Sequence, residues 1–545
     1  MKRRFVPPRA PRPALLALAA AAAATVAGAQ APAVPSLPRS MPPMAAPAAS
    51  PVFAIRGFRV EGENPLGDAA TQRVLAPFVR PDATLRTLQQ ATAALEEALR
   101  DHGFGLHRVA LPPQEVGATV RLQVVKFAIG KVGVEGASFY DEGNVRRTLP
   151  ELREGESPNF RTLAIQTAIA NENPNKQVQV RLRESEEPDR IDATVTVKEK
   201  RPWTVGATLS NLGSKATGRD RFTVALGHTN LFNRDHQFVG AYTTSLERPG
   251  DVKQLGLSYK VPLYAQGGVL GATYVRSDVV GNFGAFDVTG AGHSLGLNYL
   301  LYLPPKGGRR SYVNFAIQDK VFDRLLVSGV AATMDRRSRP VTVGYTARTE
   351  TDDAAWGYNV ELAWNTGSGA NNDLASYRSE DPRIDTVHWK AVRGLAAYTA
   401  PFARTWLWTV RGAFQASPDA LIAGERYGLG GIGSIRGTEV ERPISGDSGA
   451  SGTMELSTPE LSPGLRLHGF VDAGVLRNHN ADGLGRPGSD AIASVGVGLR
   501  FERGPISAGA DYGYVVDGSK VPLTVNSFAP KRGDDRFYIT LTVKY

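Results

Sequence analysis

The sequence predicts an all-β transmembrane barrel of 16 antiparallel strands, preceded by two small α+β domains. Three observations lead to this prediction. The chain opens like a secreted protein, residues 52–200 repeat one order of elements twice, and from Trp203 onward apolar and polar residues alternate over segments of about ten residues. Together they place the chain outside the cytoplasm and most of its length in a barrel.

The first 29 residues are typical of a secretory signal peptide. An Ala/Leu run from Ala14 to Ala24 follows a basic segment that contains Lys2, Arg3, Arg4, Arg9 and Arg12. The run is about half as long as a membrane-spanning helix must be, which argues against the alternative of a membrane anchor. Residues 30–51 are rich in proline and alanine and nearly uncharged, so we expect a flexible linker there.

Composition narrows the class of protein further. After the signal peptide no apolar run approaches the ~18 residues of a spanning helix, and mean hydropathy is slightly negative. The sequence has no cysteine, so disulfides and thiolate metal ligands are excluded. The net charge of +10 falls to +5 once the five cations of the signal peptide are removed, and so small a charge over the remaining 516 residues does not argue for nucleic acid as a partner. A secreted chain with 58 glycines and 17 tyrosines belongs to the periplasm, the exterior or the outer membrane.

Residues 52–127 are predicted to form the first small α+β domain. It opens with a strand over 53–60, and strands over 107–111 and 119–125 close it. Between them runs a helical pattern whose apolar face comprises Leu85, Leu88, Ala91, Leu95 and Leu99.

Residues 128–200 are predicted to form a second domain of the same kind. It opens with a strand at 131–136, and the later elements are two helices and two strands, at 144–149, 160–171, 178–182 and 191–197. The order strand, helix, helix, strand, strand is thus expected twice, over about 75 residues each time.

Residues 201–545 are predicted to form the barrel. Sixteen candidate strands start near residues 203, 220, 236, 253, 268, 292, 310, 340, 355, 386, 404, 452, 465, 491, 505 and 536. An even number fits bacterial outer-membrane barrels. In a soluble β-sandwich, the alternative, the inward face would be apolar, whereas here that face carries Gly, Asn, Glu, Arg and Asp.

Two polar residues of the barrel region form a candidate pair. Arg436 lies in the Gly-rich segment Gly433-Ser-Ile-Arg436-Gly437, between predicted strands eleven and twelve. Asp472 lies in Phe470-Val-Asp472-Ala-Gly474 on strand thirteen, where the alternation turns its side chain inward. A guanidinium–carboxylate fork between them would pin the segment inside the barrel; two unrelated polar residues in a water-filled pore are the alternative.

These motifs resemble those of the transporters of two-partner secretion systems, the haemolysin secretion/activation family. Arg436-Gly437 is similar to its pore-loop motif, although Thr438 stands where the family usually has an aromatic residue, and 470–474 is similar to its F-x-D-x-G motif. Asn171-Glu-Asn173-Pro174 resembles the signature of its second POTRA domain. Segments 211–218 and 230–232 resemble its first barrel hairpin. The resemblance covers essentially the whole mature chain.

The resemblance implies a transporter in the cell outer membrane whose two POTRA domains lie in the periplasm. It would recognise an unfolded periplasmic partner and move it to the cell surface. The implied partners are a secreted client, in particular a large β-helical exoprotein, outer-membrane lipids, and the barrel-assembly machinery during biogenesis. An outer-membrane assembly factor of the same superfamily is the first alternative, and a passive porin, which leaves the tandem domains unexplained, is the second.

Three motifs that look catalytic fail their structural context. Residues 428–433 fit G-x-G-x-x-G, but no helix can continue through Gly437 and Pro443. Residues 292–296 fit G-x-S-x-G, but the strand alternation runs on through them. Residues 446–449 resemble a serine-protease motif without a histidine partner motif. The eight histidines show no metal-ligand spacing, so we expect no enzyme, no cofactor and no metal site.

Overall fold

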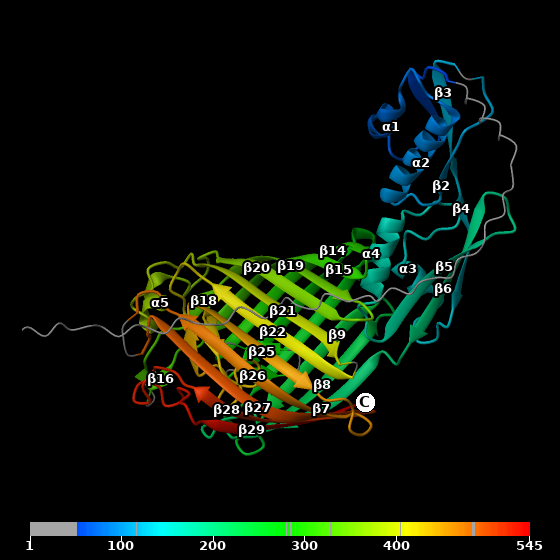
Figure 1. Cartoon of the computed structure of the whole chain (residues 1–545). Coiled ribbons are helices and arrows are strands. Elements are labelled where there is room, and N and C mark those ends of the chain that lie inside the picture. The colour runs from blue at the N-terminus through cyan, green and yellow to red at the C-terminus, as the bar shows by residue number, and fades with distance from the viewer. Residues whose placement is uncertain are drawn as a thin grey trace, which may run out of the picture. The chain divides into compact units, whose positions relative to one another are not determined.

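The computed structural model describes residues 52–545, apart from residues 116, 280, 284–285, 289, 328–329, 404 and 482–484. The predicted signal peptide, 1–29, and linker, 30–51, lie outside the described residues. Two three-stranded sheets with helices precede a closed barrel (Figure 1).

The first sheet has the order β1-β3-β2, with β1 parallel to β3. Its elements are β1 (Gly57–Gly62), α1 (Asp68–Leu75), η1 (Ala76–Phe78), α2 (Leu85–Asp101), β2 (His107–Ala110) and β3 (Thr119–Lys126). Helix α2 starts with a reciprocal capping pair between Thr84 and Thr87, and it buries Leu88, Ala91, Leu95 and Leu99 against the sheet.

Two expectations for this part of the chain were wrong in detail. Leu85 is 55% exposed rather than buried, because it is the first residue of α2 and precedes the turn that faces the sheet. The first strand begins at Gly57 rather than at Phe53, because Phe53 instead forms an isolated bridge with Ala83.

The second sheet repeats the arrangement with the order β4-β6-β5. Its elements are β4 (Ala128–Glu135), α3 (Glu142–Thr148), α4 (Phe160–Ala170), β5 (Lys176–Glu184) and β6 (Arg190–Glu199). Asp141 caps α3 and Asn159 caps α4, each by accepting hydrogen bonds from backbone amides of the first turn. In both sheets the last strand in sequence is central, so the outer strands each have one edge that is unpaired within the sheet.

The remaining strands close into a 16-stranded antiparallel barrel, which confirms the predicted fold class. The strands are β7 (Trp203–Ser210), β8 (Arg221–Leu231), β9 (His236–Thr244), β10 (Gln254–Leu263), β11 (Gly268–Ser277), β14 (Gly292–Lys306), β15 (Arg309–Phe322), β19 (Pro340–Glu350), β20 (Ala355–Asn365), β21 (Lys390–Phe402), β22 (Trp406–Ala416), β25 (Ser448–Ser457), β26 (Leu465–Arg477), β27 (Ser489–Arg503), β28 (Ile506–Asp517) and β29 (Asp535–Lys544). The short β18 (Arg336–Ser338) pairs with β15 just ahead of β19 and belongs to the same barrel strand. The barrel closes where β29 pairs with β7.

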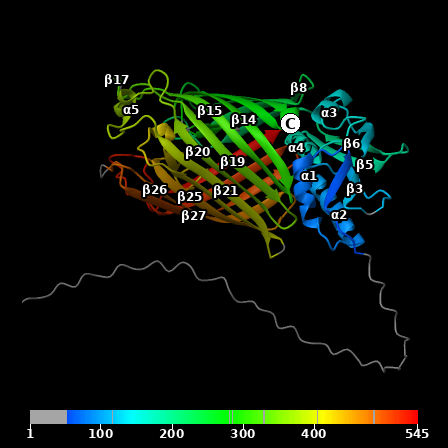
Figure 2. The same cartoon turned by 90° about the horizontal axis from the view of Figure 1, so that it is seen from above.

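The barrel has an apolar outside and a polar inside. On β20 the outward side chains of Trp356, Val360 and Leu362 are 40–49% exposed. On β26 the outward Leu467 and Val471 are exposed, whereas the inward Asp472 is fully buried. The strands slant across the barrel wall, as Figure 2 shows. Alternation of this kind suits a wall with lipid on one side and a polar lumen on the other. Among the described residues, no helix is both long and apolar enough to cross a membrane.

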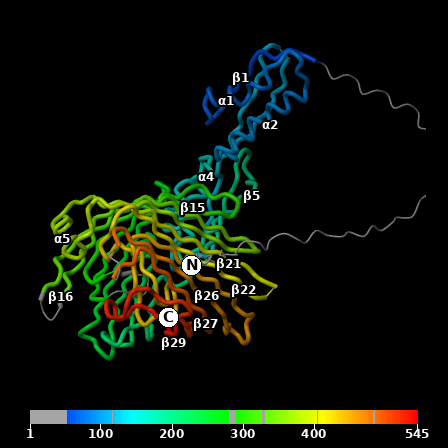
Figure 3. The backbone as a smooth tube through the Cα atoms, turned by 60° about the vertical axis from the view of Figure 1, so that its left-hand side comes forward, coloured from blue at the N-terminus to red at the C-terminus, as the bar shows by residue number. Residues whose placement is uncertain are grey.

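The two ends of the barrel differ. We call the end at which β6 leads into β7 the proximal end; its turns are short, and one holds η2 (Tyr264–Gln266). The connections at the distal end are longer, and the tube in Figure 3 traces them. They contain elements that the sequence analysis did not predict: β12 (Gly281–Phe283), β13 (Phe286–Val288), β16 (Leu326–Val327), β17 (Val330–Ala331), α5 (Leu374–Glu380), η3 (Ala423–Glu425), β23 (Tyr427–Leu429) and β24 (Ile444–Gly446).

Candidate functional site

The connection between β22 and β25, residues 417–447, folds back into the barrel; we call it the lumen loop. Its residues Ile435, Arg436 and Thr438 are 0–3% exposed. They contact inward-facing side chains of the wall strands β26, β28 and β29. The Gly-rich segment singled out in the sequence is the tip of this loop.

Arg436 and Asp472 meet at the tip. The Nε and one terminal nitrogen of Arg436 donate to the two carboxylate oxygens of Asp472, each at 2.8 Å. The backbone N–H of Arg436 also donates to Asp472, at 3.1 Å. The side chains are 4% and 0% exposed, so both charges are removed from water. A fork of this geometry fixes both the position and the orientation of the guanidinium.

The tip holds more charge than one pair. The other terminal nitrogen of Arg436 lies 3.3 Å from an oxygen of Asp511 on β28 and 3.4 Å from an oxygen of Glu455 on β25. Asp511 is itself held by His468, at 2.7 Å, and by Arg500, at 2.7 Å. The ring of Phe470 lies under the guanidinium, 3.2 Å from centroid to carbon. Arg436 is therefore bound by three wall strands at once.

Gly437 and Tyr538 complete the tip. Gly437 has a φ of +101°, and an added Cβ would lie 3.0 Å from the carbonyl oxygen of Gly513, so a side chain there would be strained on both counts. The hydroxyl of Tyr538 on β29 accepts from the N–H of Gly437 and donates to the carbonyl of Thr438. The Thr438 hydroxyl accepts from the N–H of Gly431 and donates to the carbonyl of Val440, so it bonds within the loop.

The other motif residues at the tip differ in what they contact. Gly474 on β26 faces Leu429 of the loop, whose side chain an added Cβ would meet at 2.6 Å. Gly433 lies in open space with an ordinary backbone, and nothing in the structure explains a glycine there. The sequence analysis missed Glu455, Asp511 and Tyr538. Their only signal was an inward position on a barrel strand, which many polar residues share.

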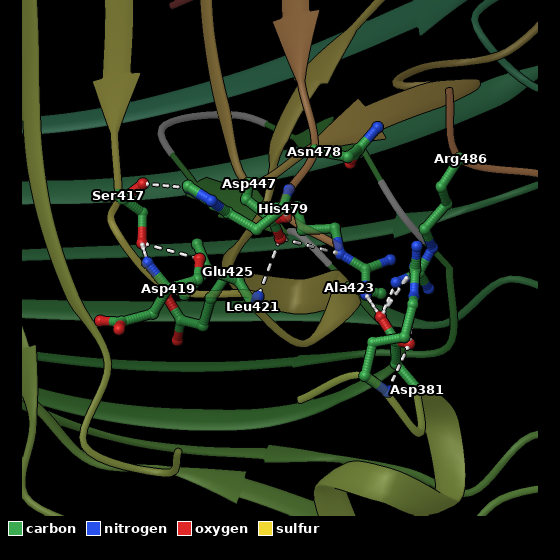
Figure 4. A network of polar contacts seen from close by, with 12 residues as sticks. Asp381, Ser417, Asp419, Leu421, Ala423, Glu425, Asp447, Asn478, His479 and Arg486 are labelled. Atoms are coloured by element: carbon green, nitrogen blue, oxygen red, sulfur yellow. Dashed lines mark hydrogen bonds and ion pairs between the residues drawn. The ribbon is translucent and has the colours of Figure 1, made fainter. Parts of the chain in front are cut away.

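The base of the lumen loop is held by a separate network at the distal end (Figure 4). Asp447 accepts from the backbone N–H groups of Leu421 and His479, both at 2.8 Å. The His479 ring bonds to the carbonyl of Ser417 at 2.7 Å. Arg426 pairs with Asp381, which follows α5, at 3.0 Å. The base is thereby joined to the neighbouring distal loops.

The Asn171-Glu-Asn173-Pro174 motif joins the second small domain to the barrel. Asn171 ends α4, and its side-chain amide brackets Val178, accepting from the N–H and donating to the carbonyl. The amide of Asn173 is buried and donates to the carbonyl of Thr229 at the end of β8. Pro174 is exposed on the intervening turn. The motif shapes the turn into β5 and ties it to the β8–β9 connection.

Lys176, two residues after that proline, is fully buried at this junction. Its ammonium group has three acceptors: Asp235 at 2.5 Å, Asn144 at 2.9 Å and Thr148 at 3.0 Å. Asp235 lies just before β9 and also accepts from the Tyr264 hydroxyl at 2.7 Å. All three ammonium hydrogens are thus used. Burial lowers the pKa of Lys176 from its ordinary value, and the nearby Asp235 carboxylate offsets this only in part.

The segment 230–232, singled out as part of a barrel hairpin, belongs to the same junction. Asn230 is buried and accepts from the amide of Asn144 on α3 at 3.2 Å. Asn233 accepts through its carbonyl from the same amide at 3.0 Å. Polar contacts from Asn144, Asn173 and Lys176 thus dock the second small domain on one proximal turn.

The catalytic-looking motifs lie in unsuitable places. Residues 292–296 continue within β14, and 428–433 run through β23 into a turn rather than a helix. In the part of the chain that the structure describes, no three His, Asp or Glu side chains are grouped to hold a metal ion.

Comparison with protein families gives two matches. The model for the haemolysin secretion/activation protein ShlB/FhaC/HecB matches residues 190–501, which is more than half of the chain. The model for the ShlB-type POTRA domain matches residues 53–126.

Individual proteins agree with these families. The outer membrane transporter CdiB of Dickeya dadantii is 24% identical, over 79% of this chain and 78% of that protein. The outer membrane transporter CdiB of Escherichia coli is 24% identical, over 86% of this chain and 79% of that protein. Among solved structures, CdiB from Escherichia coli matches with a TM-score of 0.72 at 20% identity, over 93% of each chain. CdiB from Acinetobacter baumannii matches with a TM-score of 0.68 at 15% identity, over 91% of each chain.

Proposed function

Because this chain belongs to the haemolysin secretion/activation family ShlB/FhaC/HecB, we propose that it binds an unfolded partner protein in the periplasm and passes it through the barrel to the cell surface. The chain is an outer-membrane transporter of the two-partner secretion class, with its POTRA domains on the periplasmic side. The proximal end of the barrel then faces the periplasm, and the distal end faces the exterior.

The observation that carries the proposal is a barrel whose lumen is occupied by its own loop. A passive porin needs an open channel, whereas here Arg436 is 3% exposed and bonded to three wall strands. The guanidinium of Arg436 has three carboxylate acceptors around it, so it can keep one of them while it releases another. We propose that Arg436, Gly437 and Asp472 form the lock that holds the loop at rest, with Phe470 and Gly474 in support.

The client is an extended polypeptide, in our proposal a large β-helical exoprotein. The outer strands of both small sheets have an unpaired edge to which an extended segment can add. The one motif that resembles a dinucleotide-binding site, residues 428–433, lacks the helix that it needs, so folding of the client outside the cell and its binding would supply the driving force. We further propose that the chain is not an enzyme, that it needs no cofactor, and that the barrel-assembly machinery inserts it among outer-membrane lipids.

The runner-up is an assembly factor that inserts other barrels into the outer membrane. The tandem has two small domains rather than three or five, which weighs against it, but the decisive difference is where the client is delivered. An assembly factor leaves its client in the membrane, whereas a secretion transporter delivers it to the surface or the medium.

Removal of residues 52–127 tests the proposal. The barrel has its own closed sheet, so the deletion variant should still insert and show heat-modifiable migration in outer-membrane fractions. Export of the client should stop, because the first recognition edges are lost. If a gene beside that of this chain encodes a large secreted protein, that protein is the first client to test. Undiminished export would refute a recognition role for this domain, and a client that accumulates as a membrane-inserted barrel would favour the assembly factor.

A further inference from the structure

A second ion-pair cluster holds the lumen loop far from its tip. Glu425, at the end of η3, has a side chain that is 0% exposed. Its carboxylate lies 3.1 Å from the ammonium nitrogen of Lys320 on β15 and 2.9 Å from a guanidinium nitrogen of Arg393 on β21. The backbone carbonyl of Glu425 also accepts from the side-chain amide of Gln415 on β22, at 2.9 Å.

This cluster contacts a different sector of the barrel wall than the tip of the loop does. Counted round the barrel from β7, Lys320 and Arg393 lie on the seventh and tenth strands. The partners of Arg436 lie on the twelfth, thirteenth and fifteenth strands. The loop is therefore tied to two separate sectors, and release of one tie leaves the other in place.

Gly424, the residue before Glu425, shows that the backbone of the loop lies close to the barrel wall. A Cβ added to Gly424 would lie 2.2 Å from the ring of Phe322, at the end of β15. Phe322 packs in an apolar cluster with Leu421 and Ile422 of the same loop. Only glycine lets the backbone reach this part of the wall, so the position of Glu425 is built into the loop.

The cluster borders the open part of the lumen. A cavity of about 650 Å³ lies between the loop and the wall strands, and Glu425, Lys320, Arg393 and Glu361 all line it. Lys320 and Arg393 remain 17% and 23% exposed, whereas Glu425 is fully covered. Movement of the loop away from these two cations would therefore enlarge this cavity.

We propose that Glu425, Lys320 and Arg393 form a second lock, which holds the loop against β15 and β21 and keeps the passage on that side narrow. Glu425 is the positioning residue of the lock. An extended polypeptide would pass between the loop and this wall once the lock has opened; this last step rests on the proposed transport function.

Single-channel conductance of purified Glu425→Gln protein in planar bilayers tests the lock without any client. Glutamine keeps the size of the side chain but removes its charge. A charged hydrogen-bond partner contributes roughly 1.5–3 kcal/mol, and about 1.4 kcal/mol is a factor of ten in an equilibrium. The fraction of time spent in wide openings should therefore rise at least about tenfold. In the same protein, added trypsin should cut the loop at Arg426, which is 7% exposed at rest.

Glu361→Gln is the matched control. Glu361 lines the same cavity and lies 3.8 Å from Arg393, but it belongs to β20 and cannot release the loop. Its variant should conduct as the wild type does. An equal rise in both variants would mean that lost negative charge alone changes conductance, and no rise in Glu425→Gln would mean that no lock exists; either result overturns the proposal.

Lys320→Gln tests the same ion pair by changing its partner on the barrel wall. It replaces the first test if Glu425→Gln shows no heat-modifiable migration and has therefore not folded. It should raise wide openings less than Glu425→Gln does, because Glu425 keeps Arg393 as a partner. The double variant should be no more open than Glu425→Gln alone, because that variant already removes the contact with Lys320. Unchanged conductance in Lys320→Gln would overturn the lock. Loss of secretion with unchanged conductance would overturn the lock while leaving the transport function standing.

Discussion

Replacement of Arg436 by alanine should free the tip of the lumen loop while leaving the barrel intact. The side chain makes no contact that closes the barrel, since its partners Asp472, Asp511 and Glu455 lie on strands already paired with their neighbours. The Arg436→Ala protein should therefore insert and show heat-modifiable migration. It should lose secretion and show altered conductance, because the loop no longer has a fixed place in the lumen.

The magnitude follows from the burial of the pair. Asp472 is 0% exposed, so loss of Arg436 leaves a carboxylate that water does not reach. Removal of one partner of a buried ion pair costs about 3–5 kcal/mol. The N–H of residue 436 and the Ser494 hydroxyl, at 3.4 Å, can still donate to Asp472, which favours the lower end of that range. A loss of about 3 kcal/mol shifts the loop equilibrium by roughly two powers of ten.

Secretion of the client and single-channel conductance are measured for four variants. Asp472→Ala should be milder than Arg436→Ala, because Arg436 keeps Asp511 and Glu455 as acceptors. From the sequence alone the two defects would be expected to be equal. Arg436→Lys should rescue poorly, since an ammonium group cannot form the planar fork. The double variant should be less impaired than the sum of the two single ones, since residues in one network are not additive.

Two results would refute the reasoning. Normal secretion and conductance in Arg436→Ala would mean that the ion pair does not hold the loop. Defects in Arg436→Ala and Asp472→Ala that add up in the double variant would mean that the two residues act independently, whatever their distance.

Three further predictions concern the junction and the closure of the barrel. Lys176→Ala should destabilise the docking of the second domain by about 3–5 kcal/mol, which should be seen as faster hydrogen exchange over 229–235. Replacement of Lys198, an exposed lysine on β6, by alanine should leave this exchange unchanged. Equal exchange rates in the two variants would contradict the prediction. Burial lowers the pKa of Lys176 in the docked state. Between that lowered pKa and the ordinary 10.5 the undocked state therefore binds more protons, so docking should become stronger as the pH rises through this window. A fall in hydrogen-exchange protection over this window would contradict the prediction. Deletion of Tyr538–Tyr545 removes most of β29, which pairs with both β28 and β7, and should abolish heat-modifiable barrel in outer-membrane fractions; normal assembly would show that closure does not need it.

The strands of the barrel could be predicted from the sequence because the pattern that identifies each strand lies within the strand itself. Lipid on one side and a polar lumen on the other impose a period of two on every strand, whatever lies across the barrel. All 16 predicted starts fall close to observed strands, including Trp203 for β7 and Leu465 for β26. The same argument correctly turned Asp472 inward.

The distal loops were not readable in this way. Helix α5 and the apolar cluster around Leu421 and Trp389 form because several connections meet above the lumen. No local periodicity in the sequence indicates which connections will pack together. The prediction that Leu85 is buried was wrong for a related reason. A helical pattern shows which residues share a face of the helix but not how far the sheet covers that face.

The sequence by itself thus determined the barrel, the order of elements in the tandem and one candidate pair in the lumen. Only the tertiary structure decided which charges meet: Arg436 with Asp511 and Glu455, Glu425 with Lys320 and Arg393, and Lys176 with Asp235. These partners are separated by up to 105 residues. In the lumen, the partners of Arg436 and Glu425 lie on strands whose relative stagger follows from closure of the whole barrel. The alternation along a strand shows on which side of the barrel wall a residue lies, but not which residue it faces across the lumen. A polar residue that faces water and one that faces a buried countercharge therefore have the same sequence pattern.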